Sequence, residues 1–128
     1  MMLEHLKALC QLNGISGRED AVQQYIIKQL ETWKLSYQVD PLGNILVKKD
    51  GQKPAKTKLM ISAHMDEVGG IVTYVHEDGT LQFEPVGGIQ PSVVIGRQVV
   101  VGENPGLPAV VGTTPIHLLS AKRRTTPV

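Results

Sequence analysis

A histidine and two carboxylates stand together directly after an apolar stretch of this chain. The uncharged stretch runs from Leu59 to Ala63, and His64, Asp66 and Glu67 follow it. The stretch predicts a strand that is buried on both faces, in the middle of a sheet covered by helices. Ligands collect beyond the carboxyl ends of such strands, so the position of the polar residues indicates a binding or catalytic site.

The spacing of these polar residues limits which of them can act together. Side chains alternate along a strand, so we expect His64 and Asp66 on one face and Glu67 on the other. An imidazole nitrogen is a good ligand for zinc, cobalt or manganese. A carboxylate two residues later could bind the same ion or could hold the imidazole by a hydrogen bond. Spacing alone leaves both roles open, and it also leaves open a histidine that caps a strand end beside solvated carboxylates.

Other catalytic arrangements fit these residues less well. The two carboxyl groups of a glycosidase must face each other across roughly 5 to 10 Å. Asp66 and Glu67 are neighbours whose side chains point to opposite faces of a strand, so they cannot form that pair alone. The sequence also lacks the Gly-x-Ser-x-Gly elbow of a serine hydrolase and a glycine-rich phosphate loop that opens a helix.

The string from Ala63 to Gly69 resembles a family signature. It is similar to the His-Met-Asp-Glu-(Ile/Val)-Gly motif of the M42 metallo-aminopeptidases, which include glutamyl and deblocking aminopeptidases. The resemblance continues in family order across nearly the full chain, in Asn13 to Glu19, Asp40 to Asn44, Pro85 to Gly88 and Pro115 to Ser120.

This resemblance implies a role for each residue of the motif. His64 would ligate one ion of a centre that holds two divalent metal ions, zinc or cobalt. Asp66 would be a catalytic residue that supports the histidine without binding metal. The implied activity is removal of N-terminal residues from peptide substrates by a water that the metal ions activate, with a carboxylate as general base.

Members of the family that this chain resembles are much longer. Their general-base glutamate and their remaining metal ligands lie beyond the point that matches the end of this chain. A catalytic zinc takes about three protein ligands, and His64 is the one that the sequence places here. We therefore expect the N-terminal portion of such an enzyme, inactive and at most a weak metal binder by itself. The alternative is a catalytically inactive fragment that acts only as a structural or assembly module.

The first part of the chain alternates between helix and strand patterns. Apolar residues at helical spacing predict helices over residues 3–12 and 22–33. Ser16 and Glu19 have the spacing of a capping box ahead of the second helix. Tyr25 and Trp33 are expected to pack in the core. Strands are expected at residues 37–39 and 45–48, on either side of a turn that Asp40 and Asn44 stabilise.

Beyond residue 69 the pattern becomes β-rich. Strands are expected at residues 71–76 and 81–83, joined by a turn at Asp78 and Gly79, and then at 93–95, 98–101 and 109–111. Short strands between turns are typical of a small barrel or sandwich, with no helix required. The predicted fold class is α/β. Residues 1–69 would belong to a metallopeptidase catalytic domain, with helices covering a mixed sheet, and residues 70–128 would be an incomplete β-rich domain. The resemblance implies that this inserted domain mediates dimerisation, and hence a homo-oligomer.

Composition narrows the range of partners. The net charge is +1, from 13 Lys and Arg against 12 Asp and Glu, which gives no electrostatic case for nucleic acid or an anionic membrane. The single cysteine, Cys10, cannot form a disulfide within the chain and is expected as a buried thiol. Without an N-terminal signal pattern or an apolar run long enough for a membrane span, the expected location is the cytoplasm.

The remaining histidines are expected to lie outside the site. His5 and His76 are predicted to be solvated, on a helix surface and beside a turn respectively. His117 stands beside apolar residues, where a histidine is more often a packing residue than a ligand.

Overall fold

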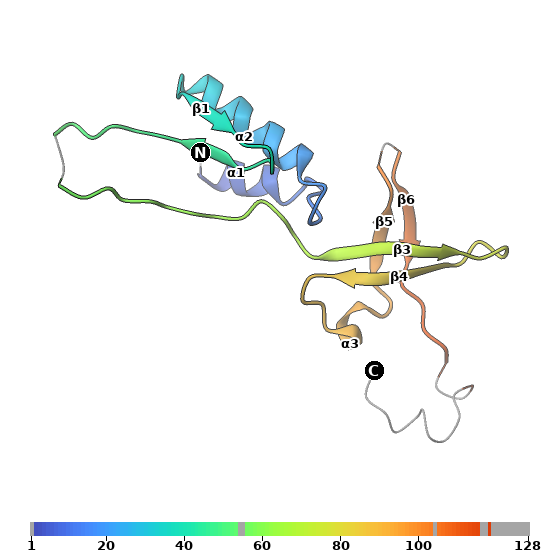
Figure 1. Cartoon of the computed structure of the whole chain (residues 1–128). Coiled ribbons are helices and arrows are strands. Elements are labelled where there is room, and N and C mark those ends of the chain that lie inside the picture. The colour runs from blue at the N-terminus through green and yellow to red at the C-terminus, as the bar shows by residue number, and fades with distance from the viewer. Residues whose placement is uncertain (1, 54–55, 104, 116–117, 119–128) are drawn as a thin grey trace. The chain divides into compact units, whose positions relative to one another are not determined.

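The computed structural model of this chain describes residues 2–53, 56–103, 105–115 and 118. The chain divides into two compact units, residues 1–87 and residues 88–128. Each unit contains helical and strand segments (Figure 1). The α/β class is therefore confirmed. The boundary after residue 69 and the dimerisation role of the residues beyond it stay predictions.

Helices α1 (Met2–Leu9) and α2 (Asp20–Thr32) form where the sequence has apolar residues at helical spacing. The end of α2 is a Schellman motif, in which Lys34 adopts a left-handed backbone with φ 56°. Leu35 N donates to Leu30 O, and Lys34 N donates to Glu31 O, so the last carbonyl groups of the helix have partners. The two buried hydrophobic side chains of the described chain, Val22 and Leu30, both lie on α2.

An aromatic cluster joins α1 to α2. His5 Nδ1 is 2.8 Å from Tyr25 Oη, and the His5 ring meets the rings of Tyr25 and Trp33 edge-on. The prediction of a solvated His5 was therefore wrong, because its helix packs this ring against two aromatic neighbours. Tyr25 is half-buried and Trp33 is largely exposed, so neither is the buried core residue that was predicted. Cys10 is exposed rather than buried, since it follows the end of α1, a helix that buries none of its residues.

Strands β1 (Tyr37–Val39) and β2 (Ile45–Val47) pair in antiparallel fashion, as predicted. The turn between them is built around Asp40. Its Oδ1 accepts hydrogen bonds from Leu42 N and Asn44 N, and its Oδ2 accepts one from Asn44 Nδ2. Gln23 Nε2 on α2 donates to Gly43 O at 2.8 Å, which ties this turn to the helix.

Strands β3 (Gly69–Val75) and β4 (Leu81–Val86) form a second antiparallel hairpin. Asp78 and Gly79 make its turn, as predicted. Asp78 Oδ1 accepts hydrogen bonds from the backbone and hydroxyl of Thr80, and Gly79 has a φ of 84°. His76, beside this turn, is half-buried and meets the Tyr74 ring edge-on, so it is not the solvated residue that was expected.

The second unit contains the short helix α3 (Pro91–Val94) and the antiparallel strands β5 (Gln98–Val101) and β6 (Leu107–Val110). The strand expected at residues 93–95 was wrong. Pro91 stands at the start of α3, where its fixed φ and missing N–H favour a helix. In the described part of the chain the strands form separate two-stranded antiparallel sheets. Neither the expected mixed sheet nor the barrel of the expected barrel or sandwich is therefore present among the described residues.

The apolar segment ahead of the histidine is extended but forms no strand. Leu59, Met60 and Ile61 are 87 to 88% exposed. Figure 1 shows the chain between β2 and β3 as a long excursion, and its described residues lack helix and strand. The prediction of a buried strand was wrong because a strand needs neighbours for its backbone hydrogen bonds, and no described strand pairs with this segment. Among the described residues, no helix is long and apolar enough to cross a membrane.

Candidate active site

The loop between α1 and α2 is docked on the segment that carries the motif. Glu67 N donates to Gly14 O at 2.7 Å, and Gly14 N donates back to Glu67 Oε1 at 3.1 Å. These bonds accompany a parallel bridge between Ile15 and Glu67. Gly14 is buried, and a Cβ on it would lie 2.8 Å from Val22 Cγ2 and 3.3 Å from Met65 O. The close approach of the two segments therefore depends on glycine at this position.

The same loop presents Ser16 to the motif. Arg18 N donates to Ile15 O at 2.8 Å, and Gly17 has a φ of 86°, which together describe a type II turn with Ser16 as its second residue. Glu19 Oε1 accepts a hydrogen bond from Gly17 N at 2.7 Å and braces the turn.

The predicted capping box was wrong. Glu19, rather than Ser16, is the N-cap residue of α2, and no side chain caps this helix by a hydrogen bond. The turn at Gly17 separates Ser16 from the helix. The Ser16 hydroxyl instead donates to Asp66 Oδ2 at 2.6 Å.

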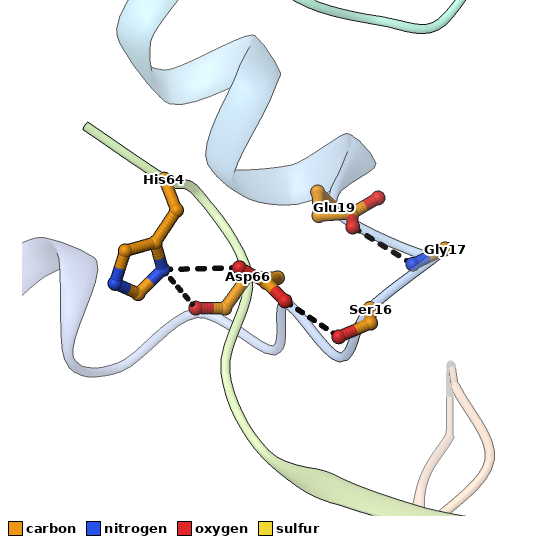
Figure 2. Close-up of polar contacts among 5 residues, drawn as sticks. All are labelled: Ser16, Gly17, Glu19, His64 and Asp66. Carbon is orange, nitrogen blue, oxygen red and sulfur yellow. Dashed lines mark hydrogen bonds and ion pairs between the residues drawn. The ribbon is translucent and has the colours of Figure 1, made fainter. Parts of the chain in front are cut away.

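His64 and Asp66 lie together, as the alternation of side chains predicted (Figure 2). His64 Nδ1 is 3.0 Å from Asp66 Oδ1 and 3.0 Å from the Asp66 carbonyl oxygen. Both partners are acceptors, so Nδ1 must carry the ring proton. In the neutral imidazole Nε2 then holds a lone pair, which is the form that binds a metal. The His64 side chain is 84% exposed, so in the described structure its ring is held mainly by Asp66.

Asp66 uses both carboxylate oxygens. Oδ1 faces His64, and Oδ2 accepts the Ser16 hydroxyl. The Ser16 hydrogen bond is the largest cause that holds the pKa of Asp66 below its ordinary value, with a further contribution from His64 and an opposing one from partial desolvation. Asp66 is therefore charged near neutral pH, and its present partners fit a residue that orients the imidazole.

The Glu67 side chain does not join this pair, because its Oε1 accepts a hydrogen bond from Gly14 N. Sequence reasoning thus anticipated the grouping of His64 with Asp66 but missed Ser16. The available clue was that Ser16 lies within residues 13–19, a segment that matches the family pattern.

An open cleft of about 450 Å³ lies beside the pair. It is lined by the start of α2 and the loop ahead of it, by the β1–β2 turn at residues 41–44 and by residues 63–66. The segments that matched the family pattern at residues 13–19, 40–44 and 63–69 thus meet around one cleft, although they are far apart in sequence.

The donor set of the described residues suits one ligand position. His64 Nε2 has the right chemistry for zinc or cobalt, because Nδ1 is already committed to Asp66. The described residues contain no group of three or more His, Cys, Asp or Glu side chains that could hold a metal. His117 lies outside the described residues.

Comparison with known proteins decides the family. The family model described as M42 glutamyl aminopeptidase matches residues 43–128. The chain belongs to the M42 family. It is 34% identical to the glutamyl aminopeptidase of Lactococcus lactis, over 92% of this chain and 34% of that protein.

Solved structures of TET peptidases are similar to this chain in sequence and fold. The TET1 peptidase of Pyrococcus horikoshii, described as assembling into a tetrahedron or a large octahedral shell, is 37% identical, with a TM-score of 0.78 over 100% of this chain and 38% of that one. A TET aminopeptidase from a marine sediment Thaumarchaeota archaeon has a TM-score of 0.85 and 28% identity, over 98% of this chain and 35% of that one. This M42 chain spans about a third of the length of the curated relatives that it matches.

Proposed function

We propose that this chain is part of a metal-dependent aminopeptidase that hydrolyses N-terminal residues from peptides. The observation that carries the proposal is the His64–Asp66 pair, which lies at the edge of a cleft within the M42 signature. Membership of the family supports the reaction class. The alternative, an inactive module that serves only assembly, draws no support from the geometry because assembly does not require an oriented imidazole.

The described residues would contribute one metal ligand and its support. Asp66 keeps the proton on His64 Nδ1 and presents the Nε2 lone pair. The hydrogen bond also fixes the direction in which the ring points. The complete site would hold two divalent ions, zinc or cobalt, with His64 Nε2 as one ligand, and the chemistry they would supply is acidification of a water and polarisation of the scissile carbonyl. Since a catalytic zinc takes about three protein ligands, residues 1–128 by themselves would bind metal weakly and would not turn over peptides.

Metal removal tests the proposal. The protein of which residues 1–128 are proposed to be a part, called the native gene product below, is purified and its mass is verified. It is dialysed against a chelator and assayed on aminoacyl-p-nitroanilides before and after addition of zinc or cobalt. Loss and recovery of hydrolysis are expected. Hydrolysis that is insensitive to chelation would contradict a metallo-aminopeptidase.

We also infer that residues 70–128 form a β-rich domain that joins subunits into a homo-oligomer. The support is the abundance of strands from β3 onward and the assemblies that the TET1 peptidase is described as forming. Removing residues 70–128 from the native gene product should lower its mass in light scattering towards that of a monomer. An unchanged assembly would refute this role. The single cysteine, which cannot form a disulfide within the chain, further favours a reducing compartment such as the cytoplasm.

A further inference from the structure

We propose that Ser16 is a positioning residue of the active site, which fixes the Asp66 carboxylate so that this group can orient His64. The proposal rests on the proposed function, because it assigns a task within the same site. Its basis is the 2.6 Å hydrogen bond from Ser16 Oγ to Asp66 Oδ2, the oxygen that does not face His64.

Asp66 needs a second partner if it is to hold the imidazole in one orientation. Rotation of a carboxylate about its last side-chain bond is broad and weakly restricted, so one hydrogen bond to His64 leaves the plane of the group poorly defined. The Asp66 side chain is 40% exposed and that of His64 is 84% exposed, so packing adds little constraint. The Ser16 hydroxyl supplies the missing point of attachment, and Figure 2 shows the chain of contacts from Ser16 through Asp66 to the ring.

Ser16 is itself held by backbone contacts. Its turn is closed by the hydrogen bond from Arg18 N to Ile15 O and is braced by Glu19 at Gly17 N. The preceding residue pair, Gly14 and Ile15, is fixed to Glu67. Because Glu67 is the direct chain neighbour of Asp66, the loop and the carboxylate are anchored at the same point. Glu67 therefore helps to set the distance between Ser16 and Asp66 without touching His64.

The expected effect of removing the hydroxyl follows from this chain of contacts. Groups that orient a metal-binding histidine typically change metal affinity or activity by about 10- to 100-fold. Ser16 acts on His64 through one more contact, so the Ser16→Ala variant should show a reduction near the lower bound of this range, about tenfold. The loss should appear in metal affinity and kcat, with KM for peptide little changed. Ser16→Thr keeps the hydroxyl and should restore most of both.

The experiment compares Ser16→Ala, Ser16→Thr and the control Ser36→Ala in the native gene product. Ser36 is an exposed serine between α2 and β1. For each variant we would measure zinc affinity by competition with a chelating dye, and kcat and KM on an aminoacyl-p-nitroanilide. In the metal-free protein, ¹⁵N NMR of the His64 ring would report which nitrogen carries the proton. Circular dichroism checks that each variant is folded.

The proposal expects the Nδ1–H form of His64 in the wild type, in Ser16→Thr and in Ser36→Ala, and a shift towards the Nε2–H form in Ser16→Ala. A folded Ser16→Ala protein with unchanged tautomer and metal affinity would overturn it. Loss of activity in Ser16→Ala that Ser16→Thr fails to restore, with an unchanged tautomer, would also overturn it. His64→Ala separates this outcome from failure of the proposed function. If that variant stays fully active, the function is refuted, while the ring tautomer still tests the role of Ser16.

Discussion

Replacement of Gly14 by alanine tests whether the α1–α2 loop must lie directly against the motif segment. The new Cβ would stand 2.8 Å from Val22 Cγ2 and 3.3 Å from Met65 O. Val22 is one of two buried hydrophobic residues among those described, so its side chain has little room to move. The φ of Gly14 is not positive, so alanine can adopt its backbone conformation and the cost is steric.

The expected cost is about 1 to 3 kcal/mol of unfolding free energy, the usual penalty for adding a carbon to a well-packed position. The entropy that alanine removes from the unfolded chain offsets about 0.4 to 1 kcal/mol of it. Gly88→Ala is the matched control. Gly88 also lacks a positive φ, and a Cβ there meets nothing within 4 Å. The difference between the two variants cancels most of the entropy gain and isolates the steric cost.

Urea denaturation of the native gene product measures both variants, and ¹H–¹⁵N spectra follow the amides of Ser16, Asp66 and Glu67. Gly14→Ala should be less stable than Gly88→Ala, with shifts concentrated at these amides. Equal stability of the two variants, with those amides unmoved, would show that the loop does not press on the motif segment.

Two further predictions concern single carboxylates. Asp66→Asn keeps an oxygen for His64 and an amide that can donate to Ser16, but it removes the charge. Turnover should fall about 10- to 100-fold with metal content near normal, and complete loss of a metal by elemental analysis would make Asp66 a ligand. For Asp40, hydrogen bonds from Asn44 are the main cause that lowers the pKa below 3.8. Its contribution to stability is therefore complete above that value and is lost as pH falls through the lower folded-state pKa. The stability gap between wild type and Asp40→Ala should narrow as pH falls below 3.8, and a gap that widens with falling pH in this range would refute the assignment.

Local features of this chain were predictable because their causes are local. The turn residues Asp40 and Gly43, and Asp78 and Gly79, determine two hairpins through side-chain hydrogen bonds and positive φ angles within a few residues. The pairing of His64 with Asp66 also follows from a short-range rule, since both side chains project to the same side of an extended segment.

Features that depend on distant partners were not predictable. The hydroxyl of Ser16 has a local alternative as a helix cap, and only the docking of Gly14 on Glu67 brings it to Asp66 instead. An apolar run such as residues 59–61 indicates that burial is favourable, but strand formation also requires neighbouring strands. For α3, the valines favoured a strand, whereas Pro91 at the first helical position favoured a helix turn.

The most direct test of a metallo-aminopeptidase centred on His64 is the metal content of the His64→Ala variant, measured beside its peptidase activity. Circular dichroism first checks that the wild-type native gene product and the variant are both folded. Both are then loaded with zinc, desalted and analysed for bound metal and for hydrolysis of aminoacyl-p-nitroanilides. We predict that the variant loses occupancy of one metal position and nearly all hydrolysis. Wild-type metal content together with wild-type turnover in His64→Ala would contradict the assignment of His64 as a ligand and of this motif as the active site.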